Sequence, residues 1–107
     1  MSDMKIRLVK FYDKKGKCVN NGDEFTYVTF QIGKEERPVE GDVLVQVTNL
    51  EGIPIIVAKY VIGKYGSGGY GRPEFVNSLE DIKKYGVSEE IVEEIRNICK
   101  SKGITWV

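Results

Sequence analysis

Residues 43–72, VLVQVTNLEGIPIIVAKYVIGKYGSGGYGR, decide the fold. The valines of residues 43–48 alternate with other side chains at a period of two, which is typical of a half-buried strand. Gly52 then provides the positive φ that a hairpin turn commonly requires. Residues 53–62 are apolar on both faces and therefore need cover on both sides of the strand. This stretch predicts the hydrophobic centre of a small antiparallel sheet, with Pro54 at the start of its second strand.

Two further strands are predicted before this centre, over residues 5–12 and 24–32. In the first, Ile6 and Leu8 alternate with residues 7, 9 and 11. Turns are predicted around Gly16 and Gly22. Residues 38–43, PVEGDV, resemble the segment that leads into a strand in many small SH3-like and OB-like barrels. That resemblance implies a five-stranded partial barrel as the alternative to an open sheet.

A helical layer is predicted after the sheet. Ser78, with Asp81 three residues later, is close to a capping box, and the short helix that follows should end at Gly86. Ser88 begins a second helix over residues 89–100, whose apolar positions form one stripe. Residues 104–107 are predicted to form a final short strand. The fold class is therefore α+β: four to five antiparallel strands, then C-terminal helices, in one domain of residues 1–107.

Composition excludes several classes of function. The formal net charge is zero, so the overall charge does not favour binding to nucleic acid or to an anionic membrane. Histidine is absent, which removes the commonest general base and metal ligand. Residues 1–11 contain no apolar signal-peptide region. Cys18 and Cys99 are too few and too distant in sequence for a metal knuckle, and we expect reduced thiols. We expect a cytoplasmic protein without a cofactor. Its composition is similar in style to that of small accessory proteins of viruses and mobile elements.

The glycine-tyrosine segment, residues 63–72, is predicted to be a loop and is the main candidate for a binding site. Its glycines allow a close approach of the backbone to a ligand. Lys64 and Arg72 add positive charge, and Tyr65 and Tyr70 could stack on bases. The segment is neither a P-loop nor a Rossmann fingerprint, because it lacks the Gly-Lys-Ser/Thr ending and a surrounding βαβ unit. A flexible linker, a binding loop and a catalytic lid are the alternatives.

Other charged residues form weaker candidates. Residues 5–17 contain six cations and one carboxylate, and Lys14, Lys15 and Lys17 form a cluster in a predicted turn. These lysines fit either a guarded sheet edge or an anion-binding face. The acids near strand ends fit solvated turns or a divalent-cation site; they are Asp23, Glu24, Glu40 and Asp42. The glutamates at the start of the second helix fit dipole stabilisation or an acidic docking face.

Three hypotheses for function follow. The first is a non-enzymatic binding protein that engages a macromolecular partner through the loop of residues 63–72 and the neighbouring sheet face. The second is nucleic-acid binding with steep salt dependence, by a patch of Lys14, Lys15, Lys17, Lys64 and Arg72. The third is a histidine-free ribonuclease-like enzyme. Because residues 53–62 are apolar on both faces, we also expect a homodimer formed through the sheet, in which the partner subunit covers one face.

Overall fold

A computed structural model describes residues 4–107 and shows an α+β fold. Seven strands form one antiparallel sheet with the order β2-β1-β3-β4-β5-β6, and β7 also pairs with β5. The sheet is larger than the four to five strands predicted from the sequence, because the short strands β2, β6 and β7 were not predicted. The strands are β1 (Lys5–Tyr12), β2 (Cys18–Val19), β3 (Tyr27–Gly33), β4 (Val43–Thr48), β5 (Ile55–Ile62), β6 (Gly68–Tyr70) and β7 (Glu74–Val76).

The register of the central strands places their apolar side chains on one face. Val9 lies opposite Phe30, which in turn lies opposite Val45 of β4. Phe30 and Val45 are fully buried, as are Val57 of β5 and most other residues of this face. Since β-branched and aromatic side chains pack well on a pleated surface, these residues both favour the strands and form their core. Pro54 immediately precedes β5, where its missing N–H costs no ladder bond.

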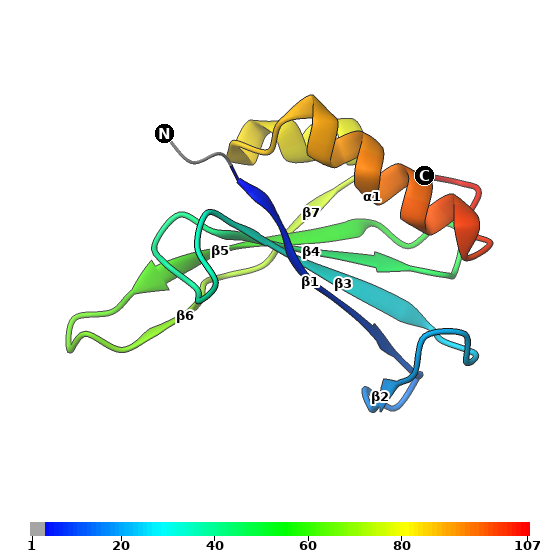
Figure 1. The fold of residues 1–107 in the computed structure, drawn as a ribbon, viewed down its shortest axis with the longest axis horizontal. Coiled ribbons are helices and arrows are strands. Elements are labelled where there is room, and N and C mark those ends of the chain that lie inside the picture. Colours follow the sequence, from blue (N-terminus) through cyan, green and yellow to red (C-terminus); the bar gives the residue numbers. More distant parts are fainter. Residues whose placement is uncertain (1–3) are drawn as a thin grey trace.

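Two helical segments cover this face of the sheet (Figure 1). They are a 3₁₀-helix, η1 (Leu79–Tyr85), and the helix α1 (Glu89–Ser101). Their buried side chains join the strand residues in one core; they are Leu79, Ile82, Ile91, Val92, Ile95 and Cys99.

The predicted helix ends were partly right. The hydroxyl oxygen of Ser88 accepts a hydrogen bond from the N–H of Ile91, and Gly86 closes η1 with φ of 90°. The capping box at Ser78 is wrong, because that side chain makes no capping hydrogen bond. The predicted strand at residues 104–107 is also wrong. Here the chain folds back, with the N–H of Ile104 donating to the carbonyl of Cys99 at 2.8 Å, and Trp106 packs against the core.

No helix of residues 4–107 covers the opposite face of the sheet, yet part of this face is buried because the sheet curls into a half-barrel. Ala58, Thr29 and Thr48 lie on this face and are each less than a tenth exposed. A β-bulge at Arg7 contributes to the shape of β1. The bulge moves Leu8 out of line with Ile6, so that Ile6 and Val9 pack on the core side and Leu8 is 38% exposed. The predicted alternation of Leu8 and Lys10 against Val9 and Phe11 is present, but the prediction that Ile6 shares a face with Leu8 is wrong because of the bulge.

The structure also shows the state of the two cysteines and the lengths of the helical segments. Both cysteines are free thiols: Cys18 is exposed, and Cys99 is buried in the core. Burial raises the pKa of Cys99 to about 12. Neither helical segment in residues 4–107 is long and apolar enough to cross a membrane.

Candidate functional site

The segment predicted to be a loop is a β-hairpin. Residues 63–67 make the turn between β5 and β6, in which the N–H of Gly63 donates to the carbonyl of Ser67 at 2.7 Å. A second bond joins the N–H of Gly66 to the carbonyl of Gly63 at 3.0 Å, and Gly66 adopts φ of 82°. Residues 68–70 then pair with β5 in regular antiparallel register. Part of the predicted loop is therefore strand.

A tyrosine pair explains why glycine is needed in β6. Tyr60 of β5 and Tyr70 of β6 lie opposite each other and pack edge to face, with their ring centroids 5.4 Å apart. The ring of Tyr60 extends over Gly68, where an added Cβ would lie 2.1 Å from the phenol oxygen of Tyr60. Glycine at position 68 leaves the space that the ring occupies. The tyrosine pair and the ladder to β5 together order this hairpin.

The β5–β6 hairpin exposes apolar and cationic side chains. Val61 and Ile62 are 47% and 50% exposed, although they continue the strand that fills the core, and Tyr65 at the turn is 89% exposed. Lys64 lies over the ring of Tyr65, with its ammonium nitrogen 5.9 Å from the ring centroid. Residues 55–73 contain three cations, Lys59, Lys64 and Arg72, and no carboxylate. The hairpin therefore presents an apolar and positively charged surface.

A buried polar cluster lies behind the hairpin, on the face of the sheet without helices. Arg7 and Asp42 form an ion pair with 3.8 Å between Nε and Oδ2, and their side chains are only 7% and 2% exposed. The guanidinium also donates to the carbonyl of Glu36 at 2.9 Å and to Oε1 of Gln31 at 3.0 Å. A longer contact of 3.5 Å joins Arg7 to the hydroxyl of Tyr70. Arg7 of β1 thus reaches β6 at the far side of the curled sheet.

Asp42 is held in this cluster by its backbone surroundings. Its Oδ2 atom accepts a hydrogen bond from the N–H of Val39 at 3.1 Å, and its own carbonyl accepts one from the N–H of Tyr60 at 2.8 Å. Gly33 makes room for the carboxylate, because an added Cβ there would lie 2.4 Å from Oδ2. The cluster links several parts of the half-barrel. Arg7 of β1 contacts β3, β6 and the connection from β3 to β4, and Asp42 contacts Arg7 and the backbone of Val39.

Sequence reasoning did not find this cluster. Asp42 was considered as a turn acid or cation ligand, and Arg7 only as one of many cations. Among residues 4–107, no three His, Cys, Asp or Glu side chains gather in a way that could hold a metal ion. Burial raises the pKa of Tyr70 above its ordinary value, and the nearby Arg7 opposes that shift. A phenol with a raised pKa is less readily deprotonated at neutral pH and so less available as a general base.

The structure divides the predicted cationic patch into two parts. Lys14, Lys15 and Lys17 lie in and beside the turn between β1 and β2, where the side chain of Asp13 accepts hydrogen bonds from the N–H groups of Lys15 and Lys17. Lys64 and Arg72 flank β6. β2 and β6 are the two ends of the strand order, and these two strands lie at opposite ends of the molecule (Figure 1). One compact ligand cannot contact both groups.

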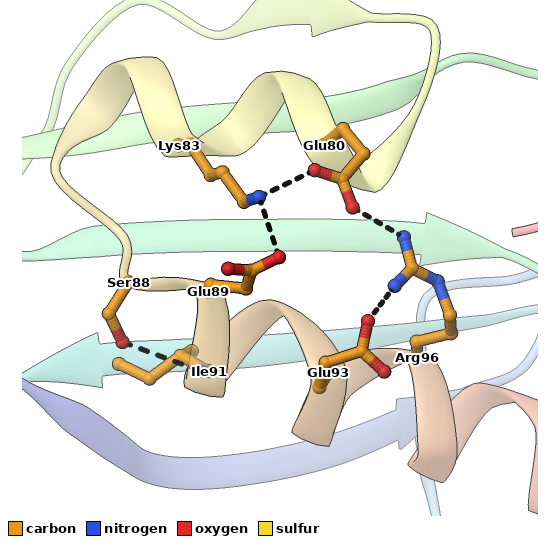
Figure 2. Close-up of polar contacts among 7 residues, drawn as sticks. All are labelled: Glu80, Lys83, Ser88, Glu89, Ile91, Glu93 and Arg96. Atoms are coloured by element: carbon orange, nitrogen blue, oxygen red, sulfur yellow. Dashed lines mark hydrogen bonds and ion pairs between the residues drawn. The ribbon is translucent and has the colours of Figure 1, made fainter.

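The glutamates of α1 are partly neutralised by basic residues. Figure 2 shows Lys83 between Glu80 and Glu89, and Arg96 between Glu80 and Glu93. The ammonium nitrogen of Lys83 lies 2.6 Å from a carboxylate oxygen of Glu80 and 3.4 Å from one of Glu89. The hydrogen bond from Lys83 lowers the pKa of Glu80 most, and the hydrogen bond from Arg96 lowers it further. This network joins η1 to α1. Its geometry favours a structural role for Glu89 and Glu93 over the docking face considered from the sequence.

One cleft among the described residues is lined by charges of both signs, with carboxylates in excess. It has a volume of about 780 Å³ and lies between the start of β1, the connection from β3 to β4, and the beginning of α1. Its charged lining residues are of both signs: Lys5, Lys34, Glu40, Asp42, Glu90 and Glu94. A lining of this kind does not select a particular class of ligand.

Comparison of the chain with protein-family models, with curated proteins and with solved structures found no match.

Proposed function

We propose that this is a non-enzymatic binding protein that engages a macromolecular partner through the β5–β6 hairpin. One observation carries the proposal: an ordered hairpin exposes Val61, Ile62 and Tyr65 beside three cations, without any carboxylate. Val61 and Ile62 lie on opposite faces of β5, so the hairpin exposes apolar side chains on both faces, which fits an interaction surface. Tyrosine and arginine are also among the residue types that most often contribute strongly to binding at interfaces.

The chemistry of the polar cluster favours binding over catalysis. Both terminal nitrogens of the Arg7 guanidinium donate hydrogen bonds within the protein, to Glu36 and Gln31, and the group also pairs with Asp42. The raised pKa of Tyr70 works against proton abstraction near neutral pH. A ribonuclease-like mechanism needs an acid and a base that both reach a bound phosphate. The cluster offers a structural support for the hairpin instead.

The proposal is tested by partner capture with matched variants. The affinity-tagged protein and a Lys64→Ala, Tyr65→Ala, Arg72→Ala variant are each used to isolate partners from cells that produce the protein. A Lys14→Ala, Lys15→Ala variant, altered at the other end of the sheet, is the control. A partner retained by the wild type and by the control, but lost by the hairpin variant, supports the proposal. Equal retention by all three proteins would refute it.

Nucleic acid is the second candidate partner, and the exposed ring of Tyr65 beside Lys64 favours it. Bases stack on exposed aromatic rings, and cations next to the ring attract the phosphates. Fluorescence anisotropy with labelled single- and double-stranded oligonucleotides at low and moderate salt tests this candidate. We expect binding to be salt-sensitive and to be lost in a Lys64→Ala, Arg72→Ala variant. No binding at low salt would eliminate it.

A further inference from the structure

The two outer edges of the sheet are protected differently. The outer edge of β1 pairs with β2 only at Phe11 and Tyr12. The rest of that edge carries Lys5, Lys10 and the bulge at Arg7. Lysines and bulges are common devices that prevent a sheet edge from pairing with another chain. β6 has neither device: it reads Gly-Gly-Tyr, and Gly68 and Gly69 are exposed.

The hydrogen-bond pattern shows which backbone groups of β6 face outward. Bonds between β5 and the hairpin join Gly63 to Ser67 and Lys59 to Gly71. In an antiparallel ladder, the residues that bond to a given neighbour alternate along the strand. Residues 67, 69 and 71 therefore face β5, and the N–H and C=O groups of Gly68 and Tyr70 point away from it. This edge is a template for one more strand.

We propose that the free edge of β6 binds an extended acidic peptide segment, which adds to the sheet as a further strand. The inference rests on the function proposed above and specifies the partner's chemistry. Main-chain hydrogen bonds to Gly68 and Tyr70 supply the pairing, as in other cases of strand addition. On one face of the sheet, Gly68 has no side chain to separate the added strand from Ile62, which is exposed on β5, so an apolar side chain of the segment can pack across Gly68 toward Ile62.

Charge complementarity selects this occupant. Lys64 and Arg72 flank β6 in the sequence, Lys59 lies in β5, and residues 55–73 carry no carboxylate. A second copy of the chain paired through β6 would bring two sets of these cations together, and that repulsion disfavours self-pairing. Nucleic acid matches the charge but offers no row of alternating amide donors and carbonyl acceptors. An acidic peptide in an extended conformation matches both features.

The test uses a short labelled peptide of alternating Glu and Val, with two N-methylated versions of it. One version is methylated only at the Glu amides and the other only at the Val amides, so charge and composition stay the same. In an added strand only one of these two sets of amides faces β6. We expect one version to bind at least about tenfold more weakly and the other to bind nearly as well as the parent, since two or more hydrogen bonds are lost in one case only.

Amide hydrogen exchange by NMR supplies a second readout. Bound peptide should slow exchange at the N–H groups of Gly68 and Tyr70 and leave Gly69, which already faces β5, nearly unchanged. The Lys64→Ala, Arg72→Ala variant should bind the peptide more weakly, and the Lys14→Ala, Lys15→Ala control should bind as the wild type does.

Three outcomes would overturn the inference. The first is no peptide binding, whether or not an oligonucleotide binds. The second is equal weakening of binding by both methylations, and the third is a concentration-dependent dimer in the ultracentrifuge that protects the N–H of Gly68 without peptide. A partner captured through the hairpin without protection of Gly68 and Tyr70 would refute strand addition and leave the proposed function standing. Failure of both experiments would refute both.

Discussion

Replacing Asp42 by asparagine tests the closure of the half-barrel. The asparagine side chain has nearly the same shape and can still accept the hydrogen bond from Val39, but it leaves the guanidinium of Arg7 without a counter-charge. Arg7 is only 7% exposed, so water cannot replace the lost carboxylate. Removing one partner of a buried ion pair costs about 3–5 kcal/mol. We expect the lower end of that range, about 3 kcal/mol, because the hydrogen bonds to Glu36 and Gln31 remain.

The assay is urea unfolding followed by circular dichroism. A loss of about 3 kcal/mol is a large part of the roughly 5–15 kcal/mol expected for a domain of this size. With a urea dependence of about 1–3 kcal/mol per molar, the midpoint should fall by roughly 1–3 M. A double variant, Arg7→Met with Asp42→Asn, should be less destabilised than the sum of the two single variants, by about 1 kcal/mol or more.

An exposed ion pair provides the control. Lys83→Ala removes a partner of Glu80 at the surface, where solvent screens the charges, and should shift the midpoint only slightly. A midpoint for Asp42→Asn within experimental error of the wild type would show that the Arg7–Asp42 ion pair does not stabilise the fold. So would strictly additive effects of the Arg7 and Asp42 changes, because they would show that the two side chains do not interact.

Three other predictions concern single residues. Cys18 should react with a thiol reagent in the native protein, whereas Cys99 should react only on unfolding, because it is buried and its pKa is raised to about 12; rapid reaction of both thiols would contradict this. Burial raises the pKa of Tyr70 in the folded protein above the ordinary value of 10.0. The neutral phenol therefore contributes its full stabilisation below pH 10.0, and this stabilisation is lost as the pH rises through the pKa of the folded state. The difference in phenolate absorbance between the wild type and the Tyr70→Phe variant reports the titration of Tyr70. Its midpoint should lie above pH 10.0, and a midpoint below pH 10.0 would refute the raised pKa. Gly68→Ala should disorder the hairpin, because the new Cβ would overlap the ring of Tyr60, and unchanged NMR signals of the hairpin would argue against this packing.

The alternation of apolar residues was sufficient to predict the central strands. β4 and β5 were expected from the valines and isoleucines of residues 43–62, and the turn glycines Gly16, Gly22 and Gly52 all have positive φ, as expected. These features depend on residues close together in the sequence. Local patterns report them reliably because period and turn geometry are local properties.

The short strands and the polar cluster could not be predicted in this way. β6 has the composition of a loop, and it is a strand because it pairs with β5 and because Tyr60 packs over Gly68. Arg7 and Asp42 are far apart in the sequence, and only the curl of the sheet brings them together. One signal of the bulge at Arg7 was available in the sequence. The apolar residues Ile6 and Val9 are three positions apart and Val9 and Phe11 are two apart, and an extra residue between apolar positions of a strand indicates a bulge.

Site-specific photocrosslinking tests most directly whether the β5–β6 hairpin is the binding surface. A photoreactive phenylalanine analogue is placed at Tyr65, in the turn between β5 and β6, and separately at Lys14, in the turn between β1 and β2. The strands β6 and β2 lie at opposite ends of the molecule (Figure 1). Both proteins are irradiated in the cells that produce them. We expect one specific macromolecule to be crosslinked from position 65 and not from position 14. The same products from both positions, or a specific product from position 14 alone, would contradict it.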